Sequence, residues 1–168
     1  MSLLVRLATP ADAETLHRFI CELAEYEKKR DAVEVTPAEL REQMGQDHPP
    51  FECLIAEDPS VPSDPARGFA LFFYNYSTWR GRRGIHLEDL YVPPEHRGTG
   101  VGKALLATLA RVATERGCAR MEWWVLDWNT PAIDFYRGLG ATPMGDWTTF
   151  RLDRDALDQL ATQGLPLG

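Results

Sequence analysis

The chain has 168 residues, which suffices for one domain with a substantial core and leaves no room for a second. Its apolar share of 44% and charged share of 26% are typical of a soluble globular protein, and the longest apolar run, residues 69–74, is too short to span a membrane. The net charge of −7 arises in residues 1–60, which hold 13 acidic and 6 basic side chains. Such a surface repels nucleic acid and favours a cationic ligand, although from charge alone a solvated helix face is the simpler explanation.

The cysteines and histidines indicate neither disulfides nor a metal site. Cys21, Cys53 and Cys118 are odd in number, far apart and outside any Cys-x-x-Cys spacing, so we expect them to be small buried hydrophobic residues. The four histidines have no metal-ligand spacing, and we expect no metal. Arg6 interrupts the apolar N-terminus and no signal-peptide pattern is present, so we expect a cytoplasmic protein.

The first 50 residues predict a strand and two helices. Residues 4–7 alternate as a strand does, and Thr9 and Pro10 then supply a capping side chain and a proline suited to a first helical turn. The helix that follows carries apolar residues at helical spacing, namely Leu16, Phe19, Ile20, Leu23 and Ala24. Residues 36–39 repeat the start signal for a second, shorter helix.

The rest of the chain alternates between strands and helices. Strands are expected at 51–57, 68–76 and 86–92, with a proline-rich loop before the second of them. A helix over 100–116 is stopped by Gly117, a strand follows at 120–126, and a further helix opens at Asn129 and ends at Gly140. The last expected element is a strand at 148–152.

A glycine-rich turn between a strand and a helix is the most informative motif. Gly98, Gly100 and Gly102 stand at alternate positions, so no side chain keeps a phosphate away from the amides of the helix N-terminus. The P-loop is excluded, because it needs a glycine at Arg97 and Ser or Thr after Lys103. The dinucleotide fingerprint is excluded too, because its third glycine would fall at Lys103. The motif therefore predicts a phosphate cradle, and the alternative is a helix start that uses glycine only for a tight turn.

The spacing Arg-x-x-Gly-x-Gly, from Arg97 to Gly102, resembles the signature that holds the coenzyme A pyrophosphate in the GNAT acetyltransferases. Segments 22–27, 76–82, 87–92 and 125–129 resemble, within that superfamily, the diamine acetyltransferase group that includes the spermidine/spermine and thialysine enzymes. The resemblance covers nearly the whole chain. It departs at Glu52, at His86, where a tyrosine is common, and around 145–147, where the chain is shorter.

The resemblance implies a fold, a cosubstrate and a partner. The fold is mixed α/β, a single GNAT domain over residues 1–168, with a mostly antiparallel sheet flanked by helices and strands that splay at the acetyl-CoA site. The cosubstrate is acetyl-CoA and the other substrate is a small amine, with no nucleic acid, membrane or metal involved. A homodimer is expected as well.

Acetyl transfer to an amine requires a neutral amine, and two neighbouring carboxylates are candidates for the base. A lysine-like amine has a pKa of ~10.4, so holding it neutral at pH 7 costs about 4 to 5 kcal/mol. Strand alternation places Glu88 on one face and Leu87, Asp89 and Tyr91 on the other, so only one carboxylate should face a given pocket. The resemblance implies that Glu88 is the base, through a water, and that Asp89 assists. Two ordinary solvent-facing carboxylates are the alternative.

The departing thiolate requires a proton, and Tyr136 stands where the family carries the tyrosine that acts as general acid on the coenzyme A sulfur. A tyrosine that merely packs on a helix face is the alternative. Asn129 is a coenzyme A contact by resemblance and a helix cap by its sequence context, and the two roles are compatible. Amides of residues 90–92 are expected to pair with the pantetheine arm and polarise the thioester carbonyl.

By resemblance, the residues expected to bind acetyl-CoA are Leu90, Tyr91, Val92, Arg97, Gly98, Thr99, Gly100, Val101, Gly102, Lys103, Asn129 and Tyr136. Those expected to bind the acceptor amine are Arg18, Tyr26, Glu27, Trp79, Glu88 and Asp89. The leading hypothesis is acetylation of a polyamine, thialysine or lysine-like amine by direct transfer. Two alternatives remain open: an acetyltransferase that acts on protein termini or lysines, and a non-catalytic acyl-CoA-binding module.

Overall fold

The computed structural model describes residues 2–168, which form two compact units, one ending at Trp124 and the other comprising Val125–Gly168. The first unit is built on a sheet whose strands lie in chain order, β1 (Leu4–Leu7), β2 (Glu52–Glu57), β3 (Ala66–Ser77), β4 (Arg82–Tyr91) and β5 (Met121–Trp123). Neighbours from β1 to β4 are antiparallel, and β5 runs parallel to β4. This confirms the expected mixed, mostly antiparallel sheet.

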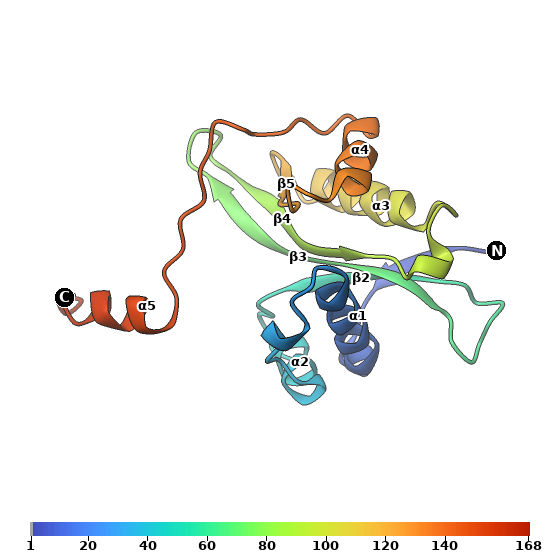
Figure 1. Ribbon diagram of the computed structural model, residues 1–168, viewed down its shortest axis with the longest axis horizontal. Helices are drawn as coiled ribbons and strands as arrows, with labels where there is room; N and C mark the ends of the chain where they lie inside the picture. Colours follow the sequence, from blue (N-terminus) through green and yellow to red (C-terminus); the bar gives the residue numbers. More distant parts are fainter. Residues whose placement is uncertain (1) are drawn as a thin grey trace. The chain divides into compact units, whose positions relative to one another are not determined.

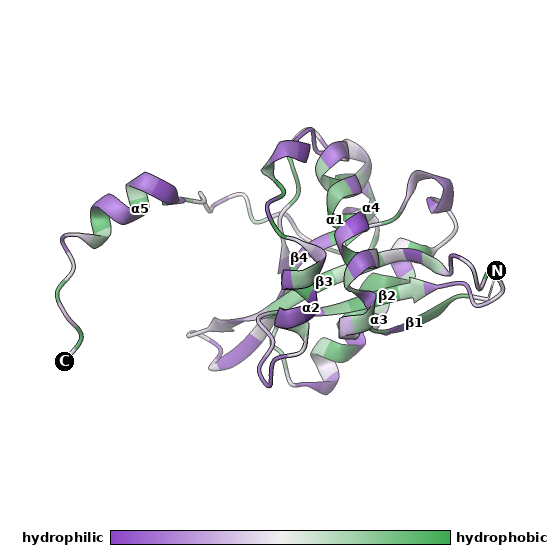
Figure 2. Cartoon of the chain, turned by 90° about the horizontal axis from the view of Figure 1, so that it is seen from below, coloured by the Kyte–Doolittle hydropathy of each residue, from purple (hydrophilic) through white to green (hydrophobic). Residues whose placement is uncertain are grey.

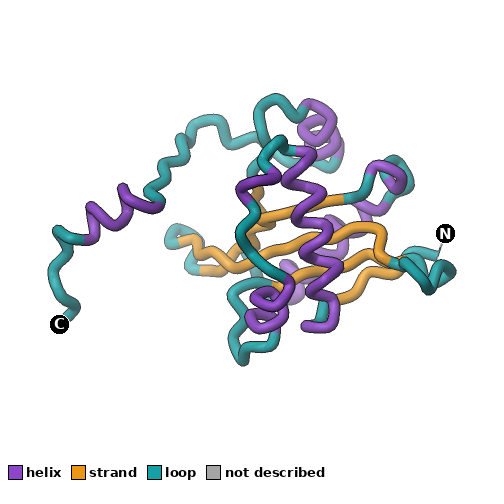
Figure 3. The backbone as a smooth tube through the Cα atoms, turned by 60° about the horizontal axis from the view of Figure 1, so that its bottom comes forward, coloured by secondary structure: helices purple, strands orange, loops and turns teal. Residues whose placement is uncertain are grey.

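Helices cover both faces of this sheet. The first face carries α1 (Ala13–Tyr26) and α2 (Pro37–Met44), and the other carries α3 (Val101–Glu115), as Figure 1 shows. Thr36 begins α2 with a reciprocal cap, in which its hydroxyl accepts from the amide of Glu39 at 3.3 Å and the Glu39 carboxylate accepts from the amide of Thr36 at 2.8 Å. Short 3₁₀ turns precede α1 at Pro10–Asp12 and α3 at Pro94–His96. Figure 3 shows α1 crossing the strands of the sheet.

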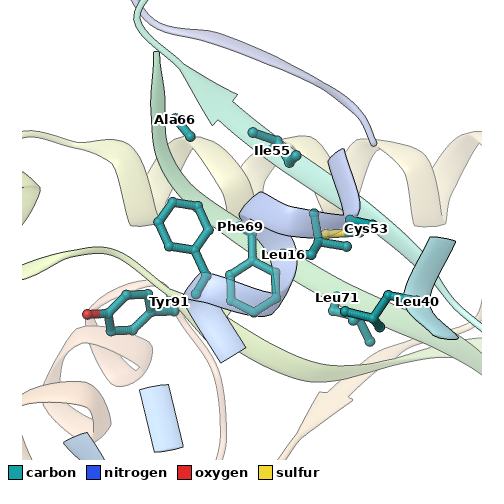
Figure 4. Close-up of a cluster of buried hydrophobic side chains, with 10 residues drawn as sticks. Leu16, Leu40, Cys53, Ile55, Ala66, Phe69, Leu71 and Tyr91 are labelled. Atoms are coloured by element: carbon teal, nitrogen blue, oxygen red, sulfur yellow. The ribbon is translucent and has the colours of Figure 1, made fainter. Parts of the chain in front are cut away.

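An aromatic cluster fixes α1 over β3 and β4. The ring of Phe19 lies 5.7 Å from that of Phe69 and 5.9 Å from that of Tyr91, between centroids. Leu16 and Phe19 are fully buried, and such a side chain contributes roughly 1.5 to 3 kcal/mol to folding. Figure 4 shows the Tyr91 hydroxyl pointing away from the cluster. The predicted apolar face of the first helix is therefore confirmed, and it sets the C-terminal end of α1 beside the end of β4.

On the opposite face, α3 is held by apolar contacts and by one ion pair. Val101, Leu105 and Leu109 are buried against the sheet. Arg116, which follows α3, donates to the Glu52 carboxylate at 2.6 Å and also to the Tyr74 hydroxyl. The departure from the family at Glu52 therefore has a structural explanation, because this carboxylate tethers α3 to β2.

The second unit differs from the sequence prediction. It contains α4 (Thr130–Gly138) and α5 (Arg154–Ala161), and no strand follows Trp123 in the described part of the chain. The predicted strand at 148–152 is wrong, because a strand needs a neighbour for its backbone groups and this segment pairs with none; Phe150 is 92% exposed. The prediction missed α5, along which apolar and polar residues alternate in Figure 2.

Smaller differences concern strand lengths and cysteines. The strand predicted at 120–126 contracts to β5, whereas β3 and β4 extend beyond their predicted bounds into a long hairpin. All three cysteines are free, and Cys53 is buried as expected, while Cys21 and Cys118 are only half-buried. Between residues 2 and 168, no helix is both long and apolar enough to cross a membrane.

Candidate active site

The turn between β4 and α3 is open where the sequence predicts a phosphate. Gly98 and Gly100 have φ of +75° and +92°, and a Cβ at either position would meet no atom within 4 Å. The first hydrogen bond within α3 runs from the amide of Ala104 to the carbonyl of Gly100, at 2.9 Å. The amides of residues 101–103 precede it, so they and the positive end of the helix dipole are available to an anion. The glycines therefore form a tight turn that also leaves room for an anion, and the cradle role stays a prediction.

Arg97 connects this turn to the end of α1. Its Nε donates to the carbonyl of Val92 at 2.9 Å, and its guanidinium carbon lies 4.9 Å from the centroid of the Tyr26 ring and 5.9 Å from that of Tyr91. Cation–π contacts of this kind contribute about 0.5 to 2 kcal/mol. A residue expected at the cofactor and one expected at the acceptor are thus in direct contact.

The side chains of the other residues predicted to form the cradle lie in the turn, in the core or in solvent. The Thr99 hydroxyl donates to the carbonyl of His96 at 2.6 Å and closes the turn. Val101 has its side chain in the core, which leaves its amide for a ligand, and Lys103 is exposed. Gly68 on β3 allows the close approach of this region, because a Cβ there would lie 2.7 Å from the Tyr91 carbonyl oxygen.

A pocket of about 250 Å³ lies beside Arg97, lined by Glu22, Glu25, Tyr26, Tyr91, Pro94 and Arg97. Burial, followed by the negative charge of Glu22, raises the pKa of Tyr91 to about 12. The site residues predicted from sequence did not include Glu22 or Glu25. The acidic excess of residues 1–60 was the signal that pointed to this helix, although it could not say which carboxylates face the pocket.

A bulge in β4 corrects the predicted alternation of its side chains. Leu71 of β3 pairs with Asp89, and the next residue, Phe72, pairs with Leu87, so Glu88 is an extra residue without a partner. Because Leu71 and Phe72 face opposite sides of the sheet, Leu87 and Asp89 do so too. The expectation that they share a face is wrong: Leu87 packs on the α3 side and Asp89 on the α1 side.

Both carboxylates lie on the α1 side of the sheet. His86 pairs with Phe73, which alternates with Leu71 on that side, and the Glu88 carboxylate oxygen Oε2 lies 3.6 Å from Nε2 of His86. The bulge therefore turns Glu88 toward the same face as Asp89. The prediction that only one of the two could serve a given pocket is wrong, and the reason is that a bulge cannot be recognised from a regular period of two.

Two carboxyl groups near this face have a raised pKa. Burial raises the pKa of Asp89 to about 7, and the negative charges of Glu88 and Glu27 add to the effect. Burial also raises the pKa of Glu27, just beyond the end of α1. Three residues that the sequence assigns to the acceptor, Glu27, Glu88 and Asp89, are thus close enough to influence one another's charge.

The two remaining acceptor candidates of the first unit lie in the turn between β3 and β4 and on α1. Trp79 is 91% exposed in the turn between β3 and β4. From the start of β4, six residues, or about 20 Å of strand, lead to Glu88. Arg18 is half-exposed and pairs with Glu22 at 3.5 Å and Asp64 at 3.4 Å.

The remaining candidates lie at the end of β4 or in the second unit. Leu90 is half-buried, and the pairing of β4 with β5 ends at Leu87, before the residues expected to meet the pantetheine arm. In the second unit, Asn129 caps α4 by accepting from the amide of Ala132 at 3.4 Å. Tyr136 is half-buried in α4, with its ring centroid 5.5 Å from that of Phe135. Its catalytic role stays a prediction.

Known proteins share this organisation. Residues 16–141 match the model of the Acetyltransferase (GNAT) family. The chain is 41% identical to "Thialysine N-epsilon-acetyltransferase" of Sus scrofa, over 95% of this chain and 98% of that protein. It is 36% identical to "Spermidine/spermine N(1)-acetyltransferase-like protein 1" of Homo sapiens, over 94% of this chain and 23% of that one. An integron cassette protein from the mobile metagenome of V. cholerae has a similar fold, with a TM-score of 0.77 at 23% identity, over 96% of this chain and 98% of that chain.

No metal site accompanies these features in the part of the chain that the structure describes. Within residues 2–168, no group of three His, Cys, Asp or Glu side chains is arranged to hold a metal ion.

Proposed function

The chain belongs to the GNAT acetyltransferase family and is an enzyme that transfers acetyl to an amine, and from this premise we propose that its acceptor is a small molecule with a second positive charge. Acetyl-CoA is the cosubstrate of this family, and the open turn at Gly98 and Gly100 fits its pyrophosphate. A polyamine, thialysine or a lysine-like amine fits the acceptor description.

One observation carries the proposal. The bulge turns Glu88 and Asp89 of β4 toward the same face, and the charge of Glu27, at the end of α1, acts on Asp89. The same strand leads into the glycine turn before α3. Clustered carboxylates attract and orient a cation, and they are in the right place to take its proton. A neutral or anionic acceptor would gain nothing from this charge.

The proposed reaction begins with removal of the amine proton. Glu88, whose side chain is 53% exposed, accepts this proton through a water. Asp89, with its pKa raised to about 7, is a second acceptor for this proton on the same face. The amine nitrogen then attacks the thioester carbonyl carbon, and an amide bond forms as the carbon–sulfur bond breaks.

The other half of the reaction concerns the carbonyl oxygen and the sulfur. Amides of residues 90–92 stabilise the oxyanion, and Tyr136 gives its proton to the thiolate. Both roles come from the family resemblance. The attacking nitrogen loses a second proton as the amide forms, and this proton replaces the one that Tyr136 gave to the thiolate. The first proton passes from the carboxylates to solvent, so the net products are an acetamide, free thiol and one released proton.

The amine panel that tests this proposal has three members: a diamine, thialysine and a neutral-tailed monoamine of similar length. Specificity constants are measured by thiol release at saturating acetyl-CoA, at low and high salt, because partly exposed charges are screened over about 8 to 10 Å. We expect the two cationic acceptors to be preferred roughly 10-fold or more at low salt, and the preference to shrink at high salt.

The matched variants are Glu88→Gln and Glu42→Gln, the second of which removes an exposed carboxylate on α2. Glu88→Gln should lower turnover most at low pH, where little free amine exists, and Glu42→Gln should leave it unchanged. Equal specificity constants for all three amines would contradict the cationic acceptor and favour a protein substrate.

A cytoplasmic homodimer is also part of the proposal, on the family resemblance alone. Sedimentation of the purified chain at several concentrations tests the dimer. A single species with the mass of one 19.0 kDa chain at all concentrations would contradict it.

A further inference from the structure

A buried histidine lies directly beside the proposed base. His86 is 8% exposed and is one of four buried polar or charged residues in the described chain, the others being Asp58, Arg67 and Ser77. Local hydrogen bonds account for the other three: Asp58 accepts from Ser60, Arg67 donates to the carbonyls of 64 and 66, and Ser77 accepts from the amide of residue 80. The ionisable neighbour of His86 is Glu88.

Two aromatic rings hold the imidazole, one from a strand and one from the residue that follows a strand. Its centroid lies 5.0 Å from that of Phe73 on β3, at an interplanar angle of 33°, and 5.1 Å from that of Trp124, just after β5, at 75°. These contacts restrict the ring plane. Nε2 is the atom that faces the Glu88 carboxylate, at 3.6 Å from Oε2.

Unlike the buried His86, Glu88 is exposed. It is the unpaired residue of the bulge, its side chain is 53% exposed, and it has three side-chain torsions. Ordering such a side chain costs about 1.5 to 2 kcal/mol of conformational entropy. A distance of 3.6 Å is slightly longer than a hydrogen bond, and a small rotation of the carboxylate or one bridging water closes it. A fixed donor beside a mobile acceptor restricts where that acceptor can point.

We propose that His86 is a positioning residue, which holds the Glu88 carboxylate in the orientation that receives the proton of the acceptor amine. This rests on the proposed function, in which Glu88 is the base. Nε2 carries a proton in the neutral Nε2–H tautomer and in the imidazolium alike, so the donor role holds in both states. The histidine itself neither gives up nor gains a proton during transfer, and it contacts neither substrate.

Two substitutions separate positioning from packing. His86→Phe keeps an aromatic ring between Phe73 and Trp124 but removes the donor, whereas His86→Gln keeps an N–H donor and loses the ring. A packing role predicts that Phe is the better replacement in both stability and turnover. The positioning role predicts opposite orders: Phe retains the higher melting temperature, and Gln retains the higher kcat.

We expect His86→Phe to lower kcat roughly 10- to 30-fold with the KM for acetyl-CoA unchanged, because the loss affects only the orientation of the base. His86→Gln should recover most of that loss despite a lower melting temperature. In a Glu88→Gln background, His86→Phe should have little further effect, because residues that act through one another are not additive.

Contrary outcomes separate the two proposals. If Glu88→Gln lowers turnover but His86→Phe has wild-type kcat, or if the Gln variant is the poorer catalyst, the positioning role is wrong and the proposed function stands. If Glu88→Gln leaves turnover unchanged, Glu88 is not the base and both fail. Full additivity of the double variant would likewise overturn the positioning role.

Discussion

The glycine turn before α3 and the carboxylate face of β4 are adjacent in the chain but differ in what they can offer a ligand. The turn offers backbone amides, and its specificity lies in two positive φ angles and the absence of side chains. The carboxylate face offers Glu27, Glu88 and Asp89, whose properties depend on burial and on one bulge. The cofactor site should therefore tolerate changes of charge and fail when space is filled, whereas the acceptor site should behave in the reverse way.

The largest effect should come from filling space at Gly102. Unlike Gly98 and Gly100, Gly102 is not among the glycines with positive φ, so a side chain there causes no backbone strain. Alanine in a helix is favoured over glycine by about 1 kcal/mol. Gly102→Ala should therefore stabilise the fold and yet weaken acetyl-CoA binding, and Gly102→Val should weaken it by roughly 100-fold or more, because the side chain occupies the place of a phosphate oxygen.

Isothermal calorimetry with acetyl-CoA and thermal unfolding are the two measurements. The control is Gly45→Ala at the end of α2, where φ is −87° and a Cβ would lie 3.4 Å from the Arg41 carbonyl oxygen. It should leave affinity unchanged. If Gly102→Val folds and binds acetyl-CoA as tightly as the wild type, the turn is only a helix start.

Tyr136 sharpens the comparison because it belongs to neither region. Tyr136→Phe keeps the ring beside Phe135 and removes only the hydroxyl. We expect turnover to fall by ~100-fold with acetyl-CoA affinity nearly intact, since the hydroxyl acts on charge that develops in the transition state. Single-turnover kinetics at saturating substrates measure this. Unchanged turnover would reduce Tyr136 to a packing residue.

Asp89→Asn should have the smallest effect on turnover, about 10-fold, but a distinct effect on stability. Burial raises its folded-state pKa from 3.8 to about 7, so the folded protein binds this proton more tightly than the unfolded chain. Its contribution to stability is thus fully present below about pH 4 and is lost as the pH rises to about 7. Asp89→Asn should add roughly 2 to 4 kcal/mol to the free energy of unfolding at pH 8 and little at pH 4.

Urea unfolding at the two pH values measures this difference, with Asp155→Asn on the exposed α5 as the control. An equal change at pH 4 and pH 8 would show that the Asp89 carboxylate is not perturbed by its surroundings. In that case Asp89 would not be a proton acceptor near neutral pH, and the proposed difference between the carboxylate face and the glycine turn would lose its electrostatic basis.

The sequence predicted the features of the glycine turn better than those of the carboxylate face. The glycine turn was recognisable because its determinant is the residue type itself, glycine at alternate positions before a helix, and its role as a phosphate cradle stays a prediction. The helices α1, α2 and α3 were recognisable from caps and periodicity. The bulge at Glu88 was not, since it depends on the register between β3 and β4, which no local pattern encodes. Glu22 and Glu25 were missed for a similar reason, because lining a pocket together with Tyr91 and Arg97 is a tertiary property.

The second unit shows most plainly where prediction from the local sequence fails. The segment 148–152 has the composition of a strand, yet strand formation is decided by an available partner edge. The helix α5 was missed although Asp153 precedes it and Leu157 and Leu160 recur at helical spacing, because the expected strand occupied the adjacent sequence.

The extra residue in β4 also determines which evolutionary changes are open to this enzyme. Substitution at position 88 changes one side chain and leaves the core intact. Loss of a single codon there would restore a regular pleat, and either Leu87, which is 2% exposed, would be forced to the opposite face or the strand would slip against β3. A lineage can thus change the side chain at position 88 by point mutation, but a change in length at this position would disrupt the hydrophobic core.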